Sequence, residues 1–314
     1  MRGGVLVRKH TAAGCGLSIA ETGGIGYNSG NGGCRYGGKD HMRPRIRSAI
    51  ADELLDTGTL RSFRIFDTHG HMGGFSGMFM PRSDPAAMIG TMDRCGVSHL
   101  VFSHHEALQD MVAGNQKAQA AIDRWPDRLL GYWAVNPRYP DLVRDAVAQL
   151  ESRPGFAGYK ILAGYYRTSI TLPACEPLWA HAHEAKRPVL LHTWGGDPYA
   201  GSAQVREIAR RYPGATILMG HSQFGQFDDA VALAQEFPNV YCELTAAYTR
   251  AHLIDRMAAA GIEDKITYGT DLPWFDPQHA TGCIVFAAVS DTVKRKILRD
   301  NAWRLFERFL NPRT

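Results

Sequence analysis

SFRIFDTHGH, residues 62–71, is an apolar run that closes on three polar side chains, Asp67, His69 and His71. Successive side chains of a strand alternate faces, so the two histidines would point to the same side of an extended run. This spacing is typical of metal ligands, although an isolated His-x-His pair is weak evidence on its own. The meaning of the run therefore depends on whether the rest of the chain repeats it.

Apolar runs of the same kind recur along the chain, and helical patterns separate them. Short apolar runs that alternate with helices of about 10–15 residues indicate βαβ units and a parallel sheet. Eight such units predict one α/β domain, a (β/α)8 or TIM barrel. The eight runs are residues 62–71, 99–105, 128–137, 155–162, 187–194, 215–222, 239–246 and 264–271. The helical patterns are residues 85–96, 116–125, 139–153, 177–186, 203–213, 227–238, 251–261 and 290–310.

A doubly wound open sheet is the alternative architecture for this alternation. Such sheets normally carry a glycine-rich phosphate turn that opens a helix after the first strand. Here the first run is followed by HGHMGGFSGMF, in which the glycines come after the histidines and no helical pattern starts on them. The dinucleotide-binding motif is therefore absent, and the barrel is favoured.

Residues 1–41 differ from the rest of the chain in composition. Residues 1–40 hold 12 of the 33 glycines and show little hydrophobic periodicity. A segment of this kind cannot bury enough apolar surface to offset the cost of ordering it. We expect a disordered extension, or a start codon assigned too early since Met42 opens the more protein-like part, and a barrel domain over residues 42–314.

Charge and cysteine usage narrow the function classes. The net charge is +4, of which residues 1–50 supply +6, so the remaining chain carries −2. A basic surface on structured elements, as nucleic-acid binding requires, is therefore not expected. No run approaches the roughly 18 apolar residues of a membrane span. The six cysteines are scattered and read as free thiols in a reducing compartment, so we expect a cytoplasmic protein.

Polar residues gather at the carboxyl ends of the predicted strands. In a barrel these ends face one another, and reactive groups lie there. The opposite ends carry arginine and lysine instead, which independent turn or capping roles would not produce. The residues concerned are Asp67, His69, His71, Lys160, His192, His221 and Asp271.

The segments FDTHGH, LLHT, MGHS and YGTD together resemble the amidohydrolase superfamily, in particular its amidohydrolase-2 group of metal-dependent hydrolases and decarboxylases. The resemblance covers roughly residues 62–310. It implies that His69, His71, His192 and Asp271 surround one divalent ion, with zinc expected and Mn²⁺ or Fe²⁺ as alternatives. It also implies that His221 polarises substrate or exchanges a proton, and that Asp67 orients the first-strand histidines.

Lys160 leaves open whether the site holds one metal ion or two. Binuclear members of the superfamily have a carboxylated lysine at this strand, which would bridge two metals and recruit His192 and His221. Lysine is also common there in mononuclear relatives, and the segment GYKILAGYY departs from their usual pattern. One metal is favoured.

This ligand set predicts a hydrolase that acts on a C–O or C–N bond. A bound divalent metal lowers the pKa of its water toward about 7, and Asp271 and His221 would act as catalytic residues. A non-oxidative decarboxylase using the same ligands is the alternative. A barrel that only binds a ligand is less favoured, because the set of potential ligands and proton-transfer residues is complete.

The loops after the strands predict an aromatic pocket for a small, cyclic or aromatic organic molecule. Tyr165, Trp194 and Trp274 would line it, and Arg167 would hold a substrate carboxylate bidentately. A loop with glycine hinges and large apolar residues after the first strand, residues 73–84, would act as a lid. The family resemblance implies a homo-oligomer.

Overall fold

A computed structural model describes residues 47–310, and it confirms the predicted barrel. Eight parallel strands form one sheet in the order β1 to β8. The predicted extension at residues 1–41 lies outside the described residues. The strands are β1 (Ile65–Met72), β2 (Val97–His104), β3 (Leu129–Val135), β4 (Phe156–Ile161), β5 (Pro188–Trp194), β6 (Thr216–Phe224), β7 (Val240–Glu243) and β8 (Ile266–Thr267).

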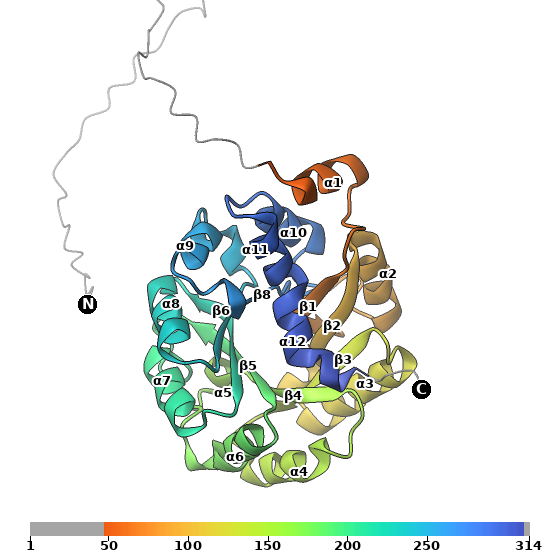
Figure 1. Ribbon diagram of the computed structural model, residues 1–314. Helices are drawn as coiled ribbons and strands as arrows, with labels where there is room; N and C mark the ends of the chain where they lie inside the picture. The colour runs from red at the N-terminus through yellow and green to blue at the C-terminus, as the bar shows by residue number, and fades with distance from the viewer. Residues whose placement is uncertain (1–46, 311–314) are drawn as a thin grey trace, which may run out of the picture. The chain divides into compact units, whose positions relative to one another are not determined.

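Helices follow the strands and cover the outside of the barrel, as Figure 1 shows. Each helical pattern of the sequence corresponds to at least one of them. The helices are α1 (Ala49–Thr57), α2 (Pro85–Cys95), α3 (Met111–Arg124), α4 (Pro140–Leu150), α5 (Ala163–Tyr166), α6 (Glu176–Glu184), α7 (Ser202–Arg211), α8 (Phe227–Glu236), α9 (Leu253–Ala259), α10 (Pro277–Val285), α11 (Asp291–Arg295) and α12 (Asn301–Phe306). A π-helical turn, Lys296–Asp300, joins α11 to α12, and short 3₁₀ turns stand at His105–Leu108, Pro173–Cys175, Ala247–Thr249, Glu263–Lys265 and Glu307–Phe309.

The eighth predicted run, residues 264–271, is a regular strand over only two residues. Beyond Thr267 the chain leaves the regular ladder but still hydrogen bonds to β1. The amide of Thr68 donates to the carbonyl of Tyr268 (2.9 Å), and the amide of Asp271 donates to the carbonyl of His69 (2.7 Å). The barrel thus closes between its first and last strands through irregular backbone, and this irregular backbone carries Asp271.

Aromatic and aliphatic side chains fill the amino-terminal end of the barrel. Phe66 and Tyr132 point inward from β1 and β3, and Phe306 of α12 packs between them with ring centroids 5.7 and 6.0 Å away. Figure 1 shows α12 lying across this opening. Each of these three side chains is fully buried. Among the described residues, packed side chains therefore fill the amino-terminal end of the barrel.

Two sequence predictions concern the chain as a whole. The free cysteines of the described part include three buried thiols, Cys95, Cys175 and Cys242, as expected for small apolar side chains in a core. Among residues 47–310 no helix has both the length and the apolar character needed to cross a bilayer.

Candidate active site

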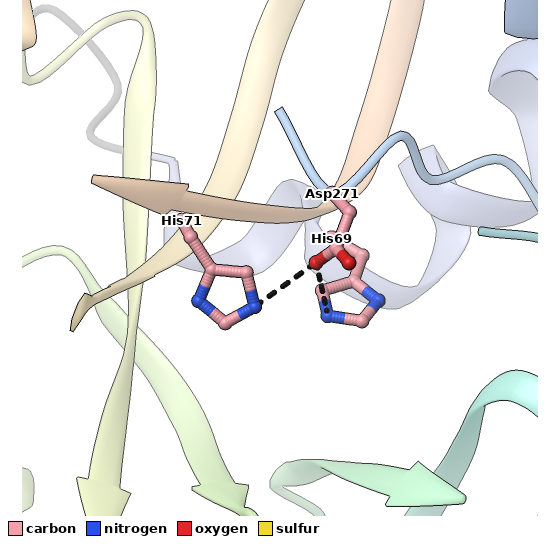
Figure 2. Close-up of side chains that lie close together, drawn as sticks. All are labelled: His69, His71 and Asp271. Atoms are coloured by element: carbon pink, nitrogen blue, oxygen red, sulfur yellow. Dashed lines mark ion pairs between the residues drawn. The ribbon is translucent and has the colours of Figure 1, made fainter. Parts of the chain in front are cut away.

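His69 and His71 of β1 meet Asp271 at the carboxyl end of the barrel. Asp271 Oδ1 lies 3.0 Å from Nε2 of His71 and 3.3 Å from Nε2 of His69, as Figure 2 shows. Ligand atoms of the three residues lie within 4.8 Å of one another, which suits a metal ion. Of the residues predicted to bind metal, the structure brings these three together.

A metal ion requires neutral imidazoles and an ionised carboxylate as ligands, and the pKa directions of His69, His192 and Asp271 agree with this requirement. Burial holds the pKa of His69 and of His192 well below the ordinary value for histidine. Burial acts to raise the pKa of Asp271, but the facing His69 and His71 hold it well below the usual range. The donor set of imidazole nitrogens and one carboxylate is typical of zinc and other first-row divalent ions.

His192 and His221 lie beside this cluster. The ring centroid of His221 is 5.2 Å from that of His69 and 4.7 Å from that of His192. The Nδ1 atom of His192 is buried and has no hydrogen-bond partner among the described residues. A buried nitrogen without a partner, on a ring next to a cluster of potential ligands, is a group that a bound ion could satisfy.

His221 begins an unusual backbone turn. His221, Ser222 and Gln223 all have positive φ, at 67°, 50° and 53°. A non-glycine residue in this region costs roughly 1–2 kcal/mol, so such a run persists only when its surroundings hold it. Here the Ser222 hydroxyl donates to the carbonyl of Glu243 (2.8 Å), and the Gln223 amide donates to Thr193 Oγ1 (3.0 Å). Asp271 also has a positive φ, 59°, so both predicted catalytic residues have a left-handed backbone.

Asp67 acts on the backbone and not on the imidazole rings. Its Oδ1 accepts from the amides of His69 (3.0 Å) and Thr270 (3.2 Å), and its Oδ2 lies 2.5 Å from Thr270 Oγ1. Burial raises the pKa of Asp67 to about 8. The side chain thus joins the end of β1 to the segment that carries Asp271, which is an orienting position.

Lys160 of β4 reaches the same cluster from the opposite wall. Its Nζ lies 2.7 Å from Nε2 of His69, and burial lowers its pKa to about 8. Lys160 thus contacts His69, whereas the binuclear alternative would join it to a site shared by His192 and His221. The number of metals stays a prediction.

A cavity of about 190 Å³ opens above the cluster. Rings form most of its wall: Tyr165 meets His192 edge-on with centroids 5.3 Å apart, and Trp194 stacks on His192 at 5.8 Å. Trp274 lines the opposite side next to Phe75. Its lining residues are His71, Phe75, His105, Leu108, Leu162, Tyr165, His192, Trp194, His221, Ala246, Asp271, Trp274 and Phe275.

Arg167 does not lie where the sequence suggested. It ends α5 with a φ of 50°, its side chain is exposed, and it is not among the residues that line the cavity. In the loop after β1, Phe75 faces the cavity, but Met78 and Phe79 are exposed. The described lining of this cavity contains no lysine and no arginine.

Two further residues belong to the site. Glu243 ends β7 and binds Nδ1 of His69 (2.8 Å). His105 stacks on His71 with centroids 4.8 Å apart, its Nδ1 donates to the carbonyl of Gly73 (2.7 Å), and its Nε2 accepts from Trp274 Nε1 (2.9 Å). Glu243 was not named as a site residue from the sequence, although an acidic residue inside the apolar run NVYCELTA could have indicated it.

Fold and site together define a (β/α)8 barrel with a candidate metal centre at the carboxyl ends of its strands. A family model described as Amidohydrolase matches residues 66–308, and the chain belongs to this family. The enzyme family predicted from the sequence is thereby confirmed. No curated protein matches the chain.

Solved structures share the barrel at low sequence identity. The 2,6-dihydroxybenzoate decarboxylase from Rhizobium is 16% identical, with a TM-score of 0.64 over 78% of this chain and 98% of that one. The 5-carboxyvanillate decarboxylase from Novosphingobium aromaticivorans, solved with manganese and 4-hydroxy-3-methoxy-5-nitrobenzoic acid, is 15% identical, with a TM-score of 0.61 over 78% and 96%. An uncharacterized TIM-barrel protein from Bordetella bronchiseptica is 16% identical, with a TM-score of 0.67 over 79% and 99%. These likenesses show the fold.

Proposed function

We propose that this protein is a metal-dependent, non-oxidative decarboxylase of small aromatic acids. The observation that carries the proposal is the cavity, whose walls are aromatic, whose lining includes His71 and Asp271 of the metal cluster, and whose described lining lacks lysine and arginine. Its volume of about 190 Å³ suits one substituted benzene ring. Two of the solved structures with this fold are decarboxylases of aromatic acids, which supports the same reading.

The absence of lysine and arginine from the described lining of the cavity favours decarboxylation for a physical reason. When a carboxylate leaves as CO2, its negative charge moves from the carboxylate oxygens onto the ring carbon. An arginine paired with the carboxylate would stabilise the ground state more than the transition state, and so would slow the reaction. The described wall of this cavity places no lysine or arginine beside the carboxylate.

His69, His71, His192 and Asp271 would hold the ion, and Mn²⁺ or Zn²⁺ fits this donor set. When bound, the ion supplies Lewis-acid attraction for oxygens of the substrate. The aromatic walls hold the ring and exclude water. One metal remains the favoured count, since Lys160 contacts His69 directly.

Asp271 is the proposed proton donor. As the bond between ring carbon and carboxylate carbon breaks, its electron pair stays on the ring carbon, which takes a proton from the carboxyl group of Asp271, and CO2 departs. Asp271 is ionised at rest because its pKa is low, so it must first take up a proton. The reaction consumes one proton, which comes from solvent, and His221, in the same cavity wall, is the proposed relay that takes up this proton and passes it to Asp271.

The test is turnover of a panel of hydroxybenzoates and of aryl esters and lactones by Mn²⁺-loaded and Zn²⁺-loaded protein in D2O. We expect CO2 release and one deuterium at the ring carbon that carried the carboxylate. The hydrolase favoured by the sequence uses the same ligands, and it would instead cleave an ester or lactone and incorporate ¹⁸O from labelled water. That result without CO2 release would overturn the decarboxylase proposal.

A further inference from the structure

Glu243 is a fully buried carboxylate whose two oxygens are both occupied by donors. Its Oε1 accepts from the amide and the hydroxyl of Thr245, each at 2.7 Å. Its Oε2 accepts from Nδ1 of His69 (2.8 Å) and from the amide of His221 (3.2 Å). Gly269 makes room for this arrangement, because a Cβ there would lie 2.0 Å from Glu243 Oε1.

The bond to His69 sets the tautomer of that ring. The amides of Thr245 and His221 and the Thr245 hydroxyl all donate to Glu243, which favours the ionised carboxylate. Against an ionised carboxylate, Nδ1 of His69 must carry the hydrogen. Nε2 of His69 then presents its lone pair toward Asp271 and Lys160. A lone pair at this nitrogen is what a metal ion binds.

The same carboxylate reaches His221 by a second route. It holds the amide of His221, whose φ is 67°, and it holds Thr245 through two bonds. The carbonyl of Thr245 lies 3.2 Å from Nδ1 of His221 and can only accept, so this nitrogen also carries its hydrogen. Nε2 of His221, the other ring nitrogen, is left as an acceptor.

We propose that Glu243 is a positioning residue that fixes the tautomers of both His69 and His221, so that Nε2 of His69 presents its lone pair to the metal cluster and Nε2 of His221, a residue of the cavity wall, is left as an acceptor. The inference rests on the proposed function for what the two rings do, but the tautomers themselves belong to the metal-free protein. If Glu243 only held β7 in place, its replacement would not change the tautomer of either ring.

Glu243→Gln tests the proposal with almost no change in shape. An amide nitrogen placed against His69 Nδ1 is a donor, and it forces the hydrogen of that ring onto Nε2. The opposite amide orientation sets the nitrogen against the two donors of Thr245. We expect ¹⁵N NMR of the metal-free variant to show His69 changing tautomer or exchanging between tautomers, and Mn²⁺ or Zn²⁺ affinity to fall about 10–100-fold.

Asp67→Asn is the matched control, because Asp67 is also a fully buried carboxylate but binds the backbone amide of His69 and not its ring. This variant should leave the tautomer of His69 unchanged. The metal-free wild-type protein supplies a measurement that needs no variant: both rings must carry hydrogen on Nδ1. Hydrogen on Nε2 of either ring, or unchanged tautomer and affinity in Glu243→Gln, overturns the proposal. Neither readout depends on decarboxylase activity, so the two proposals can fail separately.

Discussion

At the amino-terminal end of the barrel, Phe66, Tyr132 and Phe306 close the interior with rings, and cations bind backbone carbonyls around it. Arg128 Nε donates to the carbonyl of Ser98 (2.7 Å), and Arg187 Nη1 donates to that of Phe156 (3.2 Å). At the carboxyl end the interior is polar, and its carboxylates, imidazoles and Lys160 bind one another. One end therefore contributes stability, and the other holds groups ready to bind and react.

This contrast is tested most strongly by Asp271→Asn. The amide cannot supply a carboxyl proton and is a poorer metal ligand, so we expect turnover to fall by about 10²–10⁴-fold. Steady-state kinetics on the substrate found in the D2O panel measure the loss, and circular dichroism should show a folded barrel. Asp93→Asn, at an exposed carboxylate that pairs with Arg128 (2.7 Å), is the control and should retain activity. Near-normal turnover of Asp271→Asn would remove this residue from the mechanism.

Phe306→Ala tests the opposite end. Removing a fully buried ring between Phe66 and Tyr132 should lower the free energy of unfolding by about 3–5 kcal/mol. Urea denaturation measures the effect. Phe79→Ala removes a ring that is 88% exposed and should change stability by less than about 0.5 kcal/mol. Metal affinity should be the same in both variants, and a large loss of affinity in Phe306→Ala would show that the two ends are not separate.

Metal addition should raise the free energy of unfolding through the cluster at the carboxyl ends of the strands. At about 100 times its Kd, Mn²⁺ or Zn²⁺ should raise the free energy of unfolding by ~2.7 kcal/mol, because it binds the folded cluster. Thermal denaturation with and without a chelator measures the shift. His71→Ala should reduce it strongly, since Nε2 of His71 lies 3.0 Å from Asp271 Oδ1. An equal shift in this variant would place the metal elsewhere.

A smaller effect is expected where α1 meets α11, away from the barrel interior. Partial burial acts to raise the pKa of Asp291, but bonds from Ser48 (2.6 Å) and from the amide of Ile50 (3.3 Å) hold it below its usual value. A lowered pKa in the folded state stabilises the protein above the unfolded value near about 4. This contribution is lost as the pH falls through the folded pKa.

Ser48→Ala removes both the bond to Asp291 and the N-cap of α1, and should cost about 0.5–2 kcal/mol at neutral pH. Urea denaturation at pH 7 and pH 3 measures it, and the difference between variant and wild type should shrink at pH 3. An unchanged difference would mean that Asp291 contributes nothing through Ser48.

The sequence was sufficient for the barrel because strands and helices alternate with clear periods, and because the carboxyl ends of parallel strands must converge. That argument located His69, His71 and Asp271 correctly as neighbours. It missed α10, whose start at Asp276 and Pro277 carries the signal of an N-cap, since the segment after the eighth run has little helical periodicity.

The positions and contacts of single side chains were harder to predict from the sequence. Glu243 stands in an apolar run, and the run alone does not say that Gly269 leaves space for its carboxylate. Arg167 was assigned to the pocket because it follows a strand, but the left-handed backbone at that residue places its side chain in solvent. Positive φ at non-glycine residues leaves no mark in a single sequence, so the turn that begins at His221 was also beyond prediction.

The three-residue left-handed turn at His221, Ser222 and Gln223 sets a condition on transplanting this centre into another barrel. A designer who copied only the histidines and Asp271 would place His221 on ordinary strand backbone, and its ring would point in a different direction. Thr193 and Glu243 would have to be grafted as well, because they hold the turn from two neighbouring strands. The smallest portable unit is thus the ends of three adjacent strands, β5 to β7, together with β1 and the segment after β8.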